Sequence, residues 1–271
     1  QVSGYDVAKF KQQWLETPGF NRNLTQQYLN KNQFIRDFNM LQKNRYSLVE
    51  LTNIMQSDAY YPIKQYIIYK IQQLPFDERK VLLEAALATQ NIQVRQAVAE
   101  TLKVIPLDFK NSFEGLLLDN SYVTKEIALT NLCANFPEER LRYLEQTKTI
   151  IGNNDKSFRM TWLALAYNTT GFSEMERQGF VTELQYYASE AFESSIRQNA
   201  LELLLQLQPN DDQVIALLFK ATTHHKWQFT LFARNKVREL LKDSAYRKKV
   251  EELSATSEDQ MRDLFNKYLK E

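Results

Sequence analysis

Apolar residues recur at helical spacing along most of the chain and define a repeated segment of nine residues. In most copies the first, fifth and ninth positions are apolar, so each segment carries one apolar stripe along a helix. A cation follows the first position of every copy. Four copies are clear, and two weaker ones have longer spacing: IKQYIIYKI at Ile63, VRQAVAETL at Val94, TKEIALTNL at Thr124, IRQNALELL at Ile196, and the weaker copies from Phe158 to Ala166 and from Ala233 to Leu241.

Each clear copy ends at a proline, and the chain continues with an acidic residue. Three of these prolines lie 31 residues apart, a period typical of stacked helical hairpins. An acid just after the proline is able to cap the amides of the next helix. The pattern predicts an all-α fold, a right-handed α-α superhelix of the HEAT or armadillo type with about six hairpins. The prolines and acids are Pro75 with Asp77, Pro106 with Asp108, Pro137 with Glu139, and Pro209 with Asp211.

A short amphipathic stretch precedes the repeats. Residues 5–15 carry Phe10, Trp14 and Leu15 on one side and end at the turn Pro18-Gly19. We therefore expect residues 1–20 to be the tail of a preceding domain and residues 21–271 to form the helical-repeat domain. The apolar side of Phe10, Trp14 and Leu15 is predicted to pack on that preceding domain.

Further helix starts and ends can be read from polar residues. A helix is expected around residues 25–42, and a closing helix is expected to run to Glu271. Ser47 with Glu50 reads as a capping box, and Ser173 with Glu176 and Ser257 with Gln260 indicate two more helix starts.

Composition agrees with an all-helical chain and narrows its partners. The 271 residues include only six Gly and six Pro, with 44% hydrophobic and 25% charged residues. With 34 basic and 33 acidic residues the net charge is +1, which disfavours nucleic-acid binding. No apolar run approaches the roughly 20 residues of a membrane span. The first residues, Gln1 to Tyr5, include no start methionine and no signal peptide, so we expect a larger parent protein; the compartment is left open.

The chain shows no self-contained catalytic or metal-binding motif. Its only histidines are the adjacent His224 and His225, which point about 100° apart on a helix and cannot share a face as zinc ligands do. We expect this pair to be exposed or to face a loop before Trp227. The single cysteine, Cys133, occupies an apolar helical position. No Gly-rich phosphate loop or nucleophile elbow is present. We therefore expect no catalytic residue, no bound metal and no cofactor in this chain.

One segment resembles a known protein family. The run Phe10-Lys-Gln-Gln-Trp14-Leu-Glu-Thr-Pro18-Gly-Phe20 is similar to the end of the thermolysin-like catalytic domain in zinc aminopeptidases of the aminopeptidase N and leukotriene hydrolase family. The repeats resemble the HEAT-like C-terminal domain of that family, as in Val94-Arg95 with Ala97, Ala99 and Leu102. The family's His-Glu-x-x-His zinc motif and its Gly-x-Met-Glu-Asn strand are both absent from this chain.

The resemblance implies a role without catalysis. The parent would be a zinc metallo-aminopeptidase, with zinc in its catalytic domain. This chain would close over that domain and restrict the access of peptide substrates; its partners would be the catalytic domain and the peptide. Arg234, beside Trp227 and Phe229, is the residue expected to meet a substrate carboxylate.

The repeated cations are expected to have a structural role, bonding acids or carbonyls of the neighbouring repeat: Lys64, Arg95, Lys125, Arg159, Arg197 and Arg234.

A second functional hypothesis stays open beside the aminopeptidase. It is a free-standing HEAT-like scaffold that binds a partner protein on its concave face. A His-Glu-x-x-His segment upstream of Gln1 would distinguish the aminopeptidase from the scaffold.

Overall fold

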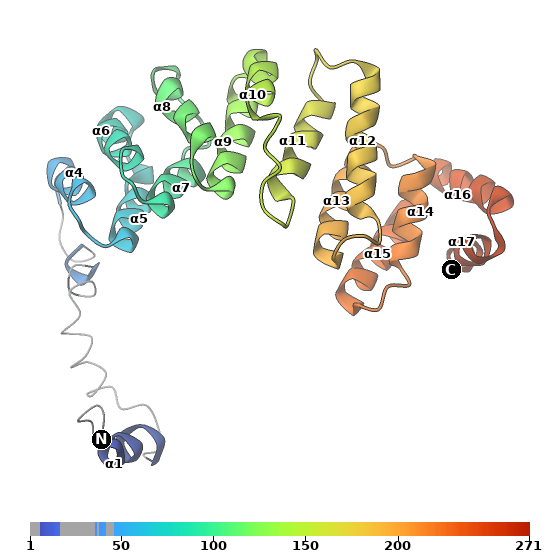
Figure 1. Ribbon diagram of the computed structural model, residues 1–271, viewed down its shortest axis with the longest axis horizontal. Coiled ribbons are helices and arrows are strands. Elements are labelled where there is room, and N and C mark those ends of the chain that lie inside the picture. Colours follow the sequence, from blue (N-terminus) through green and yellow to red (C-terminus); the bar gives the residue numbers. More distant parts are fainter. Residues whose placement is uncertain (1–5, 17–35, 37, 42–45) are drawn as a thin grey trace. The chain divides into compact units, whose positions relative to one another are not determined.

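The structure is a computed structural model that describes residues 6–16, 36, 38–41 and 46–271. Across those ranges every regular element is a helix and no strand is present (Figure 1). The predicted all-α fold is confirmed. The chain divides into two compact units, Gln1–Thr101 and Leu102–Glu271. The right-handed superhelix stays a prediction.

The first unit pairs its helices as hairpins. The helix α4 packs on α6, and α5 packs on α7, so first helices contact first helices and second helices contact second helices. The core between them includes the fully buried Met55, Ile67, Leu83 and Val98. The elements of this unit are α1 (Val7–Lys11), the π-helix η1 (Gln12–Glu16), α4 (Leu48–Gln56), α5 (Tyr61–Lys70), the 3-10 helix η2 (Ile71–Gln73), α6 (Phe76–Leu87) and α7 (Ile92–Thr101).

The second unit repeats this arrangement over a longer stretch. Second helices pack in order, α9 on α11, α11 on α13 and α13 on α15, while α12 contacts α14 and α14 contacts α17. Short 3-10 helices stand before α8, α9 and α10. The elements are η3 (Leu107–Phe109), α8 (Lys110–Glu114), η4 (Gly115–Leu118), α9 (Tyr122–Asn135), η5 (Pro137–Glu139), α10 (Arg140–Thr147), α11 (Ser157–Tyr167), α12 (Glu174–Ala188), α13 (Ser194–Leu207), α14 (Asp212–Ala221), α15 (Trp227–Leu240), α16 (Ser244–Thr256) and α17 (Asp259–Leu269).

The repeated sequence segments all form second helices of hairpins. The four clear copies lie in α5, α7, α9 and α13, and the two weaker copies lie in α11 and α15. Their apolar positions are buried, as with Ile67, Val98, Leu132 and Leu204. The predicted closing helix is α17, which pairs with α16. Helical periodicity therefore located the core-facing helix of each hairpin.

The repeat prolines lie where one hairpin ends and the next begins, as predicted. Pro75 and Pro106 are the N-caps of α6 and η3, where the fixed φ of proline suits a helix start. Pro137 is the first residue of η5, and Pro209 lies in the turn between α13 and α14.

The acids after these prolines differ in what they do. Asp211 caps α14, since its carboxylate accepts hydrogen bonds from the Gln213 and Val214 amides, both at 3.0 Å. Asp77 does not cap α6, whose N-cap Pro75 has no side-chain bond. Glu139 does not cap α10 either, because its carboxylate pairs with Lys110 and Arg142. The capping expectation was therefore right at Asp211 and wrong at Asp77 and Glu139.

Two of the three helix starts expected from serine residues are confirmed. Both Ser47 with Glu50 and Ser173 with Glu176 form complete reciprocal boxes at the starts of α4 and α12. The expected start at Ser257 is wrong by one residue, because Glu258 is the N-cap of α17 and the Ser257 hydroxyl donates to the Leu253 carbonyl at 2.6 Å. The turn at Pro18-Gly19 and most of the helix expected at residues 25–42 lie outside the described residues.

Candidate functional site

The repeated cations close the C-terminal ends of helices. In five of the six hairpins that carry one, the cation donates a hydrogen bond to a carbonyl at the end of the first helix of its own hairpin, where the helix leaves carbonyls unsatisfied and carries partial negative charge. The five bonds run from Lys64 Nζ to Ser57 O at 2.6 Å, from Arg95 Nη1 to Thr89 O at 2.6 Å, from Arg159 Nη1 to Lys148 O at 2.9 Å, from Arg197 Nε to Ala188 O at 3.3 Å and from Arg234 Nε to Thr222 O at 3.3 Å.

These contacts correct the expected partner of the repeated cations. The carbonyl that each of the five binds belongs to its own hairpin, whereas a carbonyl of the neighbouring repeat was expected. Arg159 also reaches the next hairpin, where it forms a bidentate ion pair with Glu183 of α12. Lys125 is the exception: its ammonium group lies 5.3 Å from the centre of the Tyr122 ring.

Arg234 was the residue expected to meet a peptide. It lies on α15 with its Nε on the Thr222 carbonyl at the end of α14. This contact gives Arg234 the same capping geometry as its repeat equivalents. Arg234 is exposed, and its role in peptide binding stays a prediction.

The residues expected to pack on a preceding domain lie on α1 and η1. Phe10 is 48% exposed and Leu15 is 73% exposed. Trp14 falls within η1, and its side chain lies outside the described part of the structure. Interdomain packing by these three residues stays a prediction.

A second set of capping arginines was missed by the sequence reading. Arg140, Arg177 and Arg247 stand in the first turns of α10, α12 and α16 and donate to carbonyls at the end of the preceding second helix. Arg140 bonds the Cys133 carbonyl through Nε at 3.1 Å and Nη2 at 2.9 Å. The sequence contains a signal for two of them, since Glu precedes Arg at both Glu139-Arg140 and Glu176-Arg177.

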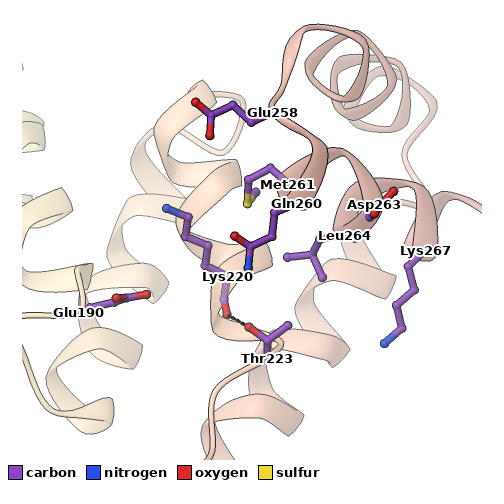
Figure 2. Close-up of a pocket in the computed structure, with 9 residues that line it drawn as sticks. All are labelled: Glu190, Lys220, Thr223, Glu258, Gln260, Met261, Asp263, Leu264 and Lys267. Atoms are coloured by element: carbon purple, nitrogen blue, oxygen red, sulfur yellow. Dashed lines mark hydrogen bonds between the residues drawn. The ribbon is translucent and has the colours of Figure 1, made fainter.

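A cavity lined by charged, polar and apolar side chains in the second unit is the best candidate for a binding site. It has a volume of about 540 Å³ and lies where the turn between α12 and α13, the end of α14 and the helix α17 come together (Figure 2). Ligand pockets typically fall between about 300 and 1,000 Å³. Its lining residues are Glu190, Lys220, Thr223, Glu258, Gln260, Met261, Asp263, Leu264 and Lys267.

Packing between α14 and α17 holds the wall of this cavity. The Phe219 ring lies edge-on to Phe265 at 4.7 Å and to Tyr268 at 5.7 Å between ring centres. These buried rings fix one face of α17 against α14. The adjacent face then presents residues at helical spacing toward the cavity, among them Gln260, Leu264 and Lys267. The Asp211 cap supports the start of α14.

The charged groups around the cavity are not paired with one another. Within the described part of the chain, Lys220, Glu258 and Asp263 form no side-chain hydrogen bond or ion pair, and Lys267 contacts only the Tyr268 ring, at 5.4 Å. Glu190 faces Lys220 across the opening in Figure 2. By contrast, the Lys249 ammonium group of the same unit lies 2.6 Å from the Asp212 carboxylate. Three carboxylates and two ammonium groups therefore remain available to a ligand.

The histidine pair lies beside this cavity in the turn between α14 and α15, which confirms that it faces a loop. The two rings lie with centres 4.1 Å apart and are tilted by 30° to one another. The Nδ1 atom of His224 accepts a hydrogen bond from the Lys226 amide at 3.0 Å. The residue before His224 is Thr223, which lines the cavity.

Among the described residues, no group of three or more His, Cys, Asp or Glu side chains is arranged to hold a metal ion. Cys133 is buried in α9, and burial raises the pKa of its thiol to about 11, against a smaller opposing effect of Arg140. In the same residues no helix combines the length and apolar character needed to cross a membrane.

No protein-family model matches the chain, and no curated protein sequence matches it.

Proposed function

We propose that the chain is a non-catalytic helical-repeat domain that binds peptide, and that its parent is a zinc-dependent aminopeptidase over whose active site it closes. The observation that carries the binding role is the cavity of about 540 Å³ with its unpaired side chains of both charges. A peptide presents charges of both signs and a backbone of amides, which suit carboxylates, ammonium groups and the Gln260 amide. The apolar side chains of Met261 and Leu264 supply contact area beside them.

The aminopeptidase context is supported by the run from Phe10 to Phe20, which is similar to the exit of the catalytic domain in that family. In this proposal the catalytic domain and zinc belong to the rest of the parent, and the catalytic domain packs on Phe10, Trp14 and Leu15. Sequencing the reading frame upstream of Gln1 tests it. A His-Glu-x-x-His motif in that frame is the expected result, and its absence from a complete upstream frame contradicts the aminopeptidase context.

Peptide binding is tested separately by calorimetric titration of the chain with short synthetic peptides that have free termini. We expect the double variant Lys220→Ala/Glu258→Ala to weaken binding about tenfold or more, as expected for loss of charge-assisted contacts. The matched control is Lys148→Ala/Glu145→Ala, which removes an exposed pair with an N–O distance of 3.5 Å outside the cavity. Equal affinities of both double variants would contradict the role of the cavity.

A second candidate is a free-standing scaffold that binds a partner protein. It is favoured by large apolar side chains that stand exposed in the second unit, including Leu118 at 85% and Trp227 at 69%. In this hypothesis such residues belong to contiguous apolar patches, which are typical of protein interfaces. Under this hypothesis Leu118→Arg and Trp227→Arg abolish complex formation with the partner in size-exclusion chromatography, whereas the cavity variants leave it unchanged.

A further inference from the structure

The turn between α14 and α15 depends on an uncharged histidine. A neutral imidazole can accept a hydrogen bond at one ring nitrogen, whereas a protonated ring carries hydrogen on both and can only donate. His224 accepts the Lys226 amide at Nδ1, and Lys226 is the N-cap of α15. The backbone carbonyl of His224 accepts a hydrogen bond from the Thr230 hydroxyl at 2.5 Å, which ties the same turn to the first part of the helix. Protonation at Nδ1 therefore removes one of the bonds that hold the turn.

The charges around His224 also oppose its protonation. His225 and Lys226 come from the same turn, and Arg197 comes from α13. The positive N-terminal end of α15 adds to them. Glu190, from the turn between α12 and α13, is the opposing acid that favours the charged ring. Burial first, and then these cations, lower the pKa of His224 below its ordinary value.

The same groups connect the turn to the cavity. Thr223 and Glu190 both line the cavity, and Glu190 interacts electrostatically with both His224 and Arg197. The Phe229 ring of α15 lies edge-on to His224 at 5.2 Å and also receives the Arg197 guanidinium at 5.2 Å. A charged His224 that releases the Lys226 amide is attracted toward Glu190, which is one of the carboxylates available to a ligand.

We propose that the turn between α14 and α15 is a proton-operated switch, in which protonation of His224 releases the Lys226 amide and draws Glu190 from the cavity. Its effect on a bound peptide rests on the proposed function, but the switch itself does not. The turn is closed at neutral pH. It opens as the pH falls through the titration of His224, below the ordinary histidine value of about 6.5.

Hydrogen exchange of the Lys226 amide, followed by NMR on the full chain without peptide, tests the switch. After correction for the intrinsic pH dependence of exchange, protection is expected to fall about tenfold as His224 titrates, comparable to the loss of a helix cap. The variant His224→Asn supplies a carboxamide oxygen that can accept the same amide two residues on and does not titrate. It is expected to retain protection and to lose its pH dependence.

A matched control uses the neighbouring imidazole. His225→Asn removes a cation that opposes the protonation of His224, so it should keep the pH-dependent step and move its midpoint to higher pH. A step that persists in His224→Asn, or one that disappears in His225→Asn, would overturn the proposal. Peptide titrations at both ends of the pH range then report on the cavity. We expect the unsubstituted chain to bind peptide more weakly at acidic pH than at neutral pH. In His224→Asn we expect the same affinity at both pH values. A switch without any peptide binding would contradict the proposed function and leave the switch standing.

Discussion

Arg159 of α11 and Glu183 of α12 face one another as a two-pronged ion pair, with Nε 2.8 Å from Oε1 and Nη2 2.7 Å from Oε2. The same guanidinium lies 4.6 Å from the centre of the Trp162 ring and donates to the Lys148 carbonyl. Both partners are largely shielded, with side-chain exposures of 16% and 30%. One arginine thus joins the end of α10, its own helix and the first helix of the next hairpin.

Replacing this arginine is expected to destabilise the second unit. Arg159→Ala should lower the free energy of unfolding by about 2 kcal/mol, because it leaves the Glu183 carboxylate partly buried without its ion-pair partner. Arg159→Lys should recover only part of this loss, because an ammonium group cannot reproduce the planar fork. Urea denaturation measures both. The control is Lys248→Ala, whose contact of 3.9 Å with Glu252 is exposed and is worth about 0.5 kcal/mol or less. Equal effects at Arg159 and Lys248 would contradict the structural role of the pair.

The first-helix arginines provide a matched comparison. Arg140→Met should cost about 1–2 kcal/mol, because it removes two hydrogen bonds to the Cys133 carbonyl. Arg79 stands at a similar place in α6, but its Nε is buried without a hydrogen-bond partner, and burial lowers the pKa of its guanidinium. Arg79→Met should therefore be neutral or slightly stabilising. Thermal melts of the two variants measure the contrast. A larger loss at Arg79 than at Arg140 would show that the carbonyl contacts are not what stabilises these positions.

The N-cap Asp211 stabilises α14, the helix that carries Lys220, and its contribution can be measured. Asp211→Ala should cost about 1–2 kcal/mol, because it leaves the Gln213 and Val214 amides without their acceptor. Asp211→Asn should retain most of the stability, since a carboxamide oxygen can accept the same bonds. Asp77→Ala is the control and should change stability by no more than about 0.5 kcal/mol, because no cap bond is present at the start of α6. Chemical denaturation distinguishes these outcomes.

Acid should destabilise the chain through two paired carboxylates. Burial alone would raise the pKa of Glu183, but hydrogen bonds from Arg159 and Tyr187 lower it overall; Glu114 is lowered in the same way by Tyr143 and Arg142. A carboxyl whose pKa is lower in the folded state stabilises the protein above its unfolded pKa of about 4.3, and this stabilisation is lost as the pH falls through the folded value. The melting temperature should therefore drop below about pH 4.5.

The double variant Glu114→Gln/Glu183→Gln is the check on this acid dependence. The double variant should be less stable than the unsubstituted chain at neutral pH. It should also lose less stability than the unsubstituted chain when the pH is lowered from neutral to acid. His224 acts in a separate window, because its lowered folded pKa makes its contribution complete above about pH 6.5 and lost as the pH falls below that value. If the double variant loses as much stability in acid as the unsubstituted chain, other groups control the acid dependence.

The helices could be predicted from the sequence because they are specified locally. The apolar stripe that includes Val94 and Val98 is visible at helical spacing, and Ser47 with Glu50 forms its box within one turn. Asp77 shows the limit of this reasoning, since an acid in the right place for a cap forms no cap when Pro75 already starts the helix. Local patterns therefore specify where helices begin more reliably than which side chain satisfies their ends.

The cavity could not be predicted in the same way. Four helices, α13 to α16, separate Glu190 from Lys267 in sequence, and the two residues reach one opening through helix packing that includes Phe219 on α17. Their sequence surroundings are those of ordinary surface charges. The role proposed for His224 could not be predicted for another reason. The adjacent histidines do not have the spacing of metal ligands, and the sequence does not show that His224 accepts a hydrogen bond from the amide two residues on.

The short sequence span of the carbonyl caps bears on how the protein reaches its native state. Lys64 and Ser57 are seven residues apart, and the most distant pair, Arg234 and Thr222, are separated by twelve. Contacts this local cost little chain entropy to close and favour rapid folding. Each hairpin that carries such a cap can therefore begin to organise as soon as its two helices have left the ribosome, with the neighbouring hairpin added to a partly formed surface.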